Sequence, residues 1–350
     1  MSLYDAVKNL PLELESYDLD VSSLDVSSGF TRKTTTIRLT GGGEEGLGED
    51  VTYEASEHDA QLERGAVLPL AGTWTIDSFS QHLADQALFE NPPERDVYVD
   101  YRRWGFESAA LDLALRQNGQ TLGQAVGREL RPLTYVVSTR LGEPPTLEPV
   151  QGWLEHYPTL RFKLDATSDW TDELVAQLRE LGCVDSVDFK GHYTGTIVDQ
   201  GADPALYRRV IGGLPGIWLE DPKIDDGTRP ILEEVSSQVT WDAIIHSVED
   251  IEALPWPPET VNVKPSRFGS LERLFAAYDY CEGNGIGAYG GGQFELGVGR
   301  GHIQYLAALF HPDTPNDVAP GGYNATEPPA GLPVSPLTVT ARPTGFQAET

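Results

Sequence analysis

The stretch between residues 160 and 266 decides the fold, because short apolar runs that end in charged residues recur along it. These runs are LRFKLDA (160–166), SVDFKGHY (186–193), GIWLEDP (216–222), QVTWDAII (238–245) and TVNVKPS (260–266). Amphipathic segments separate them, among them DWTDELVAQLRELG (169–182) and DPALYRRVIGG (203–213). Apolar strands that alternate with helices are typical of a parallel α/β sheet.

The same rhythm continues on both sides of this stretch. LTYVVST (133–139) precedes it, and GIGAYGGG (285–292) and GRGHIQYLAALFH (299–311) follow it. About eight strand–helix units result, with one of them hidden, and that number predicts a closed (β/α) barrel of the TIM type. A doubly wound open sheet is the alternative, but it would have fewer units and a nucleotide-binding fingerprint.

The first part of the chain has a different pattern. Residues 17–53 alternate as β-strands, and TIDSFSQHLADQALFE (75–90) and RRWGFESAALDLALRQNG (102–119) have helical spacing, the former with Asp77 or Ser78 as its N-cap. We therefore expect an α+β domain at 1–130, the barrel domain at 131–320 and an extended tail, rich in Pro, Gly and Thr, at 321–350.

The composition restricts the partners. Asp and Glu number 54 against 25 for Lys and Arg, so the formal net charge is −29. Such a charge excludes nucleic acid and anionic membranes as partners and favours a surface adapted to high salt. The acidic, interrupted N-terminus predicts a cytoplasmic protein, and the two cysteines form no disulfide framework or metal motif. A homo-oligomer is compatible with the sequence.

Lysine is scarce, which makes the few lysines in strand-like runs informative. Only six occur in the chain, and Lys163, Lys190 and Lys264 lie in or directly after apolar runs. A lone charge at a strand end is most often solvated or paired, but charges on five consecutive strands would meet at the open end of the barrel.

Three carboxylates accompany these lysines at the strand ends. Asp188, Glu220 and Asp242 supply hard oxygen ligands, which Mg²⁺ prefers. A lysine is too weak a base to remove a proton next to a carboxylate unaided, whereas a divalent cation offsets the second negative charge of the enediolate. The residues therefore predict a magnesium-dependent enzyme that removes the α-proton of a small-molecule carboxylate.

These motifs resemble those of the enolase superfamily, in particular its muconate-cycloisomerase-like and mandelate-racemase-like group. RFK (161–163) resembles the lysine-x-lysine motif of the second strand, and VNVKPSRFGSLERL (261–274) resembles the sixth-strand lysine segment. FESAALDLALRQNGQTLGQAVG (106–127) resembles the helix that links the capping domain to the barrel, and GGQFELGVGRGHIQYLAAL (291–309) resembles the closing segment.

The resemblance implies a capping domain followed by the barrel, and a role for each matching residue. Lys163 and Lys264 would be the acid/base pair, and Asp188, Glu220 and Asp242 would be the magnesium ligands. Arg161, in place of the first lysine, and Glu295, in the closing segment, would bind substrate. The implied reactions are racemisation, epimerisation, cycloisomerisation or elimination of water. The segment SSGF (27–30) falls where the family has a specificity loop.

Two departures from the family pattern leave the reaction open. Lys190 replaces an asparagine, and Ala243 replaces a glutamate. Lys190 could bind a second acidic group of the substrate, neutralise a carboxylate, act as a base or crowd the metal. A sugar-acid dehydratase would need a late-strand histidine, which the sequence lacks. The alternative from another class is a catalytically inactive barrel that acts as a metabolite-binding or assembly protein.

Overall fold

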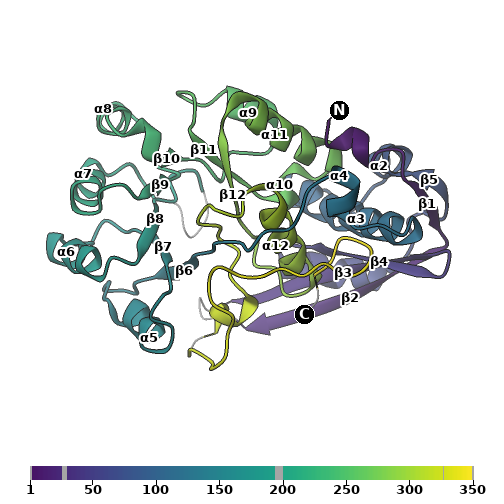
Figure 1. Ribbon diagram of the computed structural model, residues 1–350, viewed down its shortest axis with the longest axis horizontal. Coiled ribbons are helices and arrows are strands. Elements are labelled where there is room, and N and C mark those ends of the chain that lie inside the picture. The colour runs from purple at the N-terminus through teal and green to yellow at the C-terminus, as the bar shows by residue number, and fades with distance from the viewer. Residues whose placement is uncertain (1, 26–29, 194–199, 326, 349–350) are drawn as a thin grey trace.

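The computed structural model describes residues 2–25, 30–193, 200–325 and 327–348, in two parts that lie side by side (Figure 1). Strands and helices of the first part form the N-terminal domain. They are η1 (Tyr4–Ala6), β1 (Pro11–Leu14), β2 (Ser16–Asp25), β3 (Thr31–Gly41), β4 (Glu44–Asp50), α1 (Ala55–Arg64), β5 (Gly72–Thr75), α2 (Ile76–Ala84), α3 (Val97–Gln117) and α4 (Leu122–Val126).

An antiparallel sheet in the order β2-β3-β4 carries the long helix α3 on one face. A Cβ atom at Gly46 would lie 2.2 Å from the Ala109 carbonyl oxygen, and one at Gly48 would lie 1.9 Å from that of Gly105. Glycine in β4 is therefore what allows α3 to lie against the sheet. Helix α2 begins two or three residues earlier than we predict from the sequence, because the Thr75 hydroxyl, not Asp77 or Ser78, caps it by accepting the Ser78 N–H.

The second part alternates strands and helices. Its elements are β6 (Val137–Arg140), α5 (Glu148–His156), β7 (Phe162–Asp165), α6 (Asp172–Leu181), β8 (Val184–Asp188), α7 (Pro204–Gly213), β9 (Trp218–Glu220), α8 (Arg229–Glu233), η2 (Ser236–Gln238), β10 (Val239–Thr240), α9 (Val248–Glu252), β11 (Thr260–Val263), α10 (Pro265–Phe268), α11 (Leu271–Asn284), β12 (Gly287–Gly290), α12 (Val298–Phe310) and η3 (Gly321–Asn324).

These strands form a parallel ring with its helices outside. Strands β6 to β10 pair in sequence order, a parallel bridge between Trp241 and Val261 joins β10 to β11, and β11 pairs with β12. Segment 316–317 then closes the ring, because Asp317 bridges Gly291 after β12 and Asn316 bridges Tyr135 before β6. The prediction of an α+β domain followed by a TIM-type barrel is confirmed, and the hidden unit is this segment.

The C-terminal residues run back over both parts. Leu337 exchanges backbone hydrogen bonds with Leu133, and the N–H of Phe346 donates to Asp112 in α3. The Phe346 ring is fully buried and stacks on His302 of α12. The tail thereby ties the N-terminal domain to the barrel. The domain limits at residues 130 and 320 stay predictions.

Two further features agree with the composition. Cys183 and Cys281 are free and buried. Among the described residues, no helix has the length and apolar character that crossing a membrane requires. Segment 27–29 of the predicted specificity loop lies outside the described residues.

Candidate active site

The predicted charged residues lie where the parallel strands end. Lys163 lies within β7, Asp188 and Glu220 are the last residues of β8 and β9, and Lys264 directly follows β11. Asp242 comes two residues after β10. The carboxyl ends of parallel barrel strands face one mouth, so the strand order brings these side chains together. All of them are buried.

Lys163 connects two of the carboxylates. Its Nζ forms ion pairs with Glu220, with Asp188 Oδ2 at 3.1 Å and with Asp317 Oδ2 at 3.4 Å. Burial alone would lower the pKa of Lys163, but these carboxylates outweigh burial and hold its pKa well above the ordinary value. Lys163 is therefore a buried ammonium group in this arrangement.

Lys163, Asp188, Glu220, Asp242 and Lys264, with the charged side chains that they contact, form the charged cluster of the barrel mouth. Glu220 lies among the other carboxylates of this cluster. Its second oxygen accepts a hydrogen bond from the Tyr289 hydroxyl at 2.6 Å. Burial, together with the nearby carboxylates of Asp188 and Asp242, raises the pKa of Glu220 to about 8 even though Lys163 opposes the shift. The same causes raise the pKa of the neighbouring Asp221 to about 7. The cluster thus holds more negative charge than its basic side chains neutralise.

Asp242 is bound by basic groups on the opposite side of the mouth. Lys264 Nζ lies 2.9 Å from its Oδ2 and Arg267 Nη1 lies 2.6 Å from its Oδ1, while the Tyr193 hydroxyl donates to Oδ2 at 2.9 Å. Burial would raise the pKa of Asp242, but Arg267 and Lys264 hold it well below its ordinary value. Burial lowers the pKa of Lys264, against the attraction of Asp242.

The Gly-rich run after β12 leaves room for Lys264. A Cβ atom at Gly291 would lie 2.4 Å from Lys264 Cε and 2.8 Å from Asn262 Nδ2. Any side chain at this position would displace the lysine.

Lys190 occupies both oxygens of Asp188. Its backbone N–H donates to Oδ1 at 2.9 Å, and its ammonium group pairs with Oδ2. Lys190 Nζ also lies 3.4 Å from Asp165 Oδ1 and 5.0 Å from the centre of the Tyr193 ring. Of the roles considered from the sequence, this geometry corresponds to neutralising a carboxylate.

The structure does not bring Arg161 into the cluster. Its guanidinium pairs with Asp185 and donates to the Gly182 carbonyl oxygen. Arg161 directly precedes β7 and so lies toward the amino-terminal end of the barrel, away from the strand ends that carry the other charges. A substrate contact of Arg161 stays a prediction, which this position does not support.

Glu295 lies in the loop after β12, at the boundary with the N-terminal domain. Its Oε1 accepts the Gln293 N–H at 2.6 Å, and its Oε2 lies 3.2 Å from Arg300 Nη2. A water-sized space of about 10 Å³ separates Glu295 from Glu49 and Trp104. A substrate contact of Glu295 stays a prediction.

Several side chains that contact the predicted residues were not themselves predicted, among them Arg267, Asp221, Tyr289 and Asp317. Arg267 could have been found from the sequence, because it stands three residues after Lys264, about one helical turn. In the structure its side chain is buried. Asp221 follows Glu220 directly and accepts the N–H groups of residues 242 and 243 at 2.8 Å. Tyr289 and Asp317 carry no sequence signal, since only ring closure brings them to Lys163 and Glu220.

The three predicted metal ligands are suited to Mg²⁺ by chemistry, burial and charge. They are buried carboxylates at or near consecutive strand ends, and burial, followed by the nearby carboxylates of Asp188 and Asp242, raises the pKa of Glu220, a cost that a bound divalent cation would offset. As the side chains stand, no three Asp, Glu, His or Cys groups of the described residues converge for one ion. Each carboxylate is paired with lysine or arginine instead.

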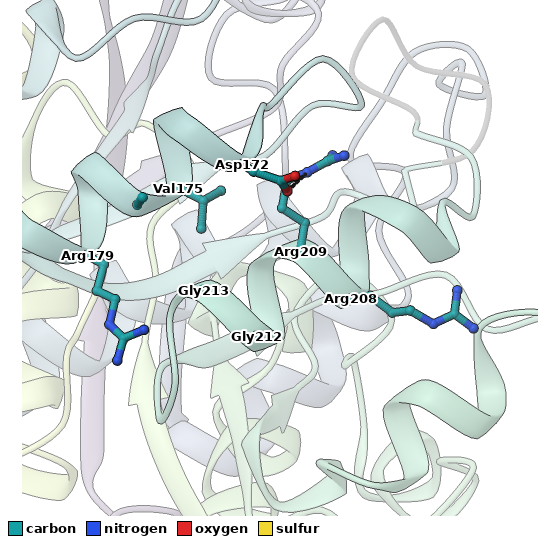
Figure 2. Close-up of a pocket in the computed structure, with 8 residues that line it drawn as sticks. Asp172, Val175, Arg179, Arg208, Arg209, Gly212 and Gly213 are labelled. Atoms are coloured by element: carbon teal, nitrogen blue, oxygen red, sulfur yellow. Dashed lines mark hydrogen bonds and ion pairs between the residues drawn. The ribbon is translucent and has the colours of Figure 1, made fainter.

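A hollow on the protein surface lies away from the charged cluster. A depression of about 320 Å³ lies between α6 and α7 on the outside of the barrel (Figure 2). Arg209 pairs with Asp172 there at 2.7 Å, and Arg179 and Arg208 extend in different directions. The arginines do not converge on a common point, so the hollow does not form a second charged site.

Comparison with known families divides the chain in the same way as the fold. A family described as domain of unknown function (DUF8230), N-terminal domain, matches residues 5–125, and its C-terminal domain matches residues 129–325. The two matches together cover most of the chain.

Curated relatives are more distant. The chain is 28% identical over 231 residues to an N-succinylamino acid racemase of Amycolatopsis, covering 63% of this chain and 59% of that protein. It is 24% identical over 212 residues to an o-succinylbenzoate synthase of Listeria innocua, covering 60% of this chain and 49% of that protein. The matches therefore span only about half to three fifths of these two relatives.

Solved structures share the fold over nearly the whole chain. A dipeptide epimerase from Methylococcus capsulatus, complexed with a magnesium ion, superimposes with a TM-score of 0.71 at 21% identity, covering 96% of this chain and 99% of that one. An enolase-superfamily member from Listeria innocua has a TM-score of 0.65 at 19% identity, covering 89% and 86%. The chain belongs to the DUF8230 family and has the enolase-superfamily fold that its motifs predict.

Proposed function

We propose that this protein is a magnesium-dependent enzyme that removes the α-proton of a carboxylate substrate through an enediolate, as a racemase, epimerase, cycloisomerase or syn-elimination lyase. One observation carries the proposal. Lys163 and Lys264 approach one mouth from opposite sides of the ring, and each is paired with a strand-end carboxylate. Strands β8, β9 and β10 separate them on one side, and β12, segment 316–317 and β6 on the other.

In this proposal Asp188, Glu220 and Asp242 would hold Mg²⁺. The ion, when bound, would offset the second negative charge that develops on the substrate carboxylate. Lys163 Nζ and Lys264 Nζ would move the α-proton, each on one face of the substrate. Arg267 and Tyr193 would fix Asp242 in place, and the burial of the cluster would exclude water.

The relatives suggest which acids to test. N-succinylamino acids, o-succinylbenzoate precursors and dipeptides are the chemistries named for them, and all carry a carboxylate next to, or conjugated with, the reacting carbon. We propose acylated amino acids as the first substrate class to test. We also propose that the acidic surface is an adaptation to high salt, in which screening reduces the self-repulsion of a net charge of −29.

Proton exchange in D₂O tests this proposal without knowledge of the final product. We expect wild-type protein with Mg²⁺ in 2 M KCl to exchange the α-proton of at least one N-succinylamino acid, followed by ¹H NMR. Lys163→Met and Lys264→Met should each reduce exchange by about 10²-fold or more, the range typical of a lost acid or base. Lys8→Met, which removes a surface lysine paired with Asp5, is the matched control. Equal exchange rates in all four proteins would contradict the roles of both lysines.

A second candidate, a metabolite-binding protein without turnover, is favoured by one specific observation. Lys190 occupies both oxygens of Asp188, a predicted metal ligand. Such a protein would bind carboxylates without exchanging their α-protons. The same NMR samples distinguish the two functions, because ligand line broadening without deuterium incorporation indicates binding alone.

A further inference from the structure

Lys190 is one of the two departures from the resemblance described above, and its contacts are specific. The backbone N–H and the ammonium group of the same residue hold the two oxygens of Asp188. Asp188 is fully buried, and only 14% of the Lys190 side chain is exposed. An ion that takes Asp188 Oδ2 as a ligand therefore competes with the Lys190 ammonium group for that oxygen, and also with Lys163 Nζ, which lies 3.1 Å from it.

The structure also contains a second carboxylate for that ammonium group. Asp165 is paired with Asp188 in the register of β7 and β8, so the two carboxylates lie side by side at the strand ends. Asp165 Oδ1 lies 3.4 Å from Lys190 Nζ and is buried without a hydrogen-bond partner. Its other oxygen, Oδ2, is bound by Arg140 Nε at 3.0 Å. The oxygen nearest to Lys190 is thus the one that lacks a hydrogen bond.

We propose that Lys190 is a built-in cation that competes with the divalent ion for Asp188 and passes to Asp165 Oδ1 when the ion binds. The inference rests on the magnesium site of the proposed function and adds a regulation of that site. Before the ion binds, the Lys190 ammonium group pairs with Asp188 Oδ2, which also lies 3.1 Å from Lys163 Nζ. Afterwards the ammonium group pairs with Asp165 Oδ1, the oxygen that Arg140 leaves free. The centre of the Tyr193 ring lies 5.0 Å from Lys190 Nζ and offers the ammonium group a cation–π contact.

The backbone of Lys190 supplies a variant that should fold. Lys190 has a φ of 53°, in the left-handed region, which asparagine adopts more readily than lysine. Lys190→Asn therefore keeps the turn that directs residue 190 toward Asp188 and removes the competing charge. Because the variant loses the ion pairs of the ammonium group with Asp188 and Asp165, circular dichroism checks that it is folded.

The experiment measures Mg²⁺ affinity by calorimetry in 2 M KCl for the wild type, Lys190→Asn, Asp165→Asn and the double variant. We expect Lys190→Asn to bind Mg²⁺ at least tenfold more tightly than the wild type. Asp165→Asn should weaken binding several-fold in the wild type, because the displaced ammonium group loses its second position. In the Lys190→Asn background the Asp165 substitution should have less than a twofold effect.

Lys223→Asn is the matched control for the loss of a nearby positive charge. The Lys223 backbone packs against Gly191, and within the described ranges Lys223 forms no ion pair. A change in affinity for Lys190→Asn no larger than that for Lys223→Asn would overturn the competition. An equal effect of Asp165→Asn on Mg²⁺ affinity in both backgrounds would also overturn it, because the Asp165 charge would then act on the ion directly and not through Lys190. Absence of saturable binding in every protein would overturn the magnesium site itself, whereas wild-type binding with unchanged Lys190→Asn affinity overturns only the role of Lys190.

Discussion

Among single residues, His302 is a buried imidazole outside the charged cluster. It lies in α12, is fully buried and stacks on the Phe346 ring at a centroid distance of 4.3 Å. Neither ring nitrogen has a hydrogen-bond partner among the described residues. Burial lowers the pKa of His302 to about 4, with Asp112 opposing and Arg116 supporting the shift.

This pKa predicts a loss of stability in acid. In the unfolded chain His302 takes up a proton near its ordinary pKa of about 6.5, whereas the folded protein resists protonation until about pH 4. Its contribution to the free energy of unfolding therefore falls as the pH drops below 6.5, by about 2 kcal/mol at pH 5. Urea unfolding measures the free energy of unfolding at pH 7.5 and at pH 5. We expect its decrease between these two pH values to be about 2 kcal/mol smaller in His302→Leu than in the wild type. Identical pH dependence in both proteins would contradict the prediction.

The charged residues of the mouth could be predicted from sequence in part. Lys163, Asp188, Glu220 and Lys264 lie in apolar runs, where a charge has no solvent and must have a partner. Arg161 could not be placed, because alternation gives the face of a strand and not the depth at which a side chain ends. Asp317, Tyr289 and the pairing of Lys190 with Asp188 depend on ring closure and side-chain rotation, which a single sequence does not encode locally.

Between elements, Glu49 joins the two domains. It lies in β4, yet its carboxylate accepts the N–H groups of Leu296, Gly297 and Gly299 at the start of α12, at 2.7–3.1 Å. A carboxylate from another element thus caps this barrel helix, whose own N-cap residue, Gly297, has no side chain. The contact holds the N-terminal domain against the loop that contains Glu295.

Removing this cap should destabilise the protein. Glu49→Ala leaves buried N–H groups without an acceptor, at a cost of about 2–4 kcal/mol in the free energy of unfolding. Glu49→Gln retains one acceptor oxygen and should lose less than half as much. Urea unfolding at pH 7.5 measures both variants. The account of Glu49 as an interdomain cap is contradicted if the two substitutions cost the same or if Glu49→Ala costs under 0.5 kcal/mol, within the range of ordinary surface changes.

For helices and strands, the sequence predicts which kind of element a segment forms better than the residues at which the element begins and ends. The strand and helix periods are evident in β7–β9 and in α6, α7 and α11, since these elements are either apolar throughout or amphipathic. Segment 316–317 escapes prediction because two residues that directly follow Pro315 carry no periodicity, and their pairing with Gly291 and Tyr135 is purely tertiary. The N-cap of α2 was misplaced because Thr75, Asp77 and Ser78 are all favourable caps.

For the whole molecule, the charge and the site set the conditions of the decisive measurement. A net charge of −29 would attract any divalent cation loosely to the surface at low ionic strength. In 2 M KCl such loose binding is screened, since the Debye length falls to about 3 Å already at 1 M. Only binding to the buried carboxylates should then remain saturable.

The measurement that tests the account most directly is therefore calorimetric titration of Mg²⁺ into wild-type protein and Glu220→Gln in 2 M KCl. Glutamine keeps the size of the side chain at the end of β9 and removes one carboxylate, and circular dichroism confirms that the variant is folded. We predict saturable binding of Mg²⁺ to the wild type and its loss in Glu220→Gln. If the wild type binds no more Mg²⁺ than the variant, the three carboxylates do not form a magnesium site and the enediolate mechanism has no electrophile.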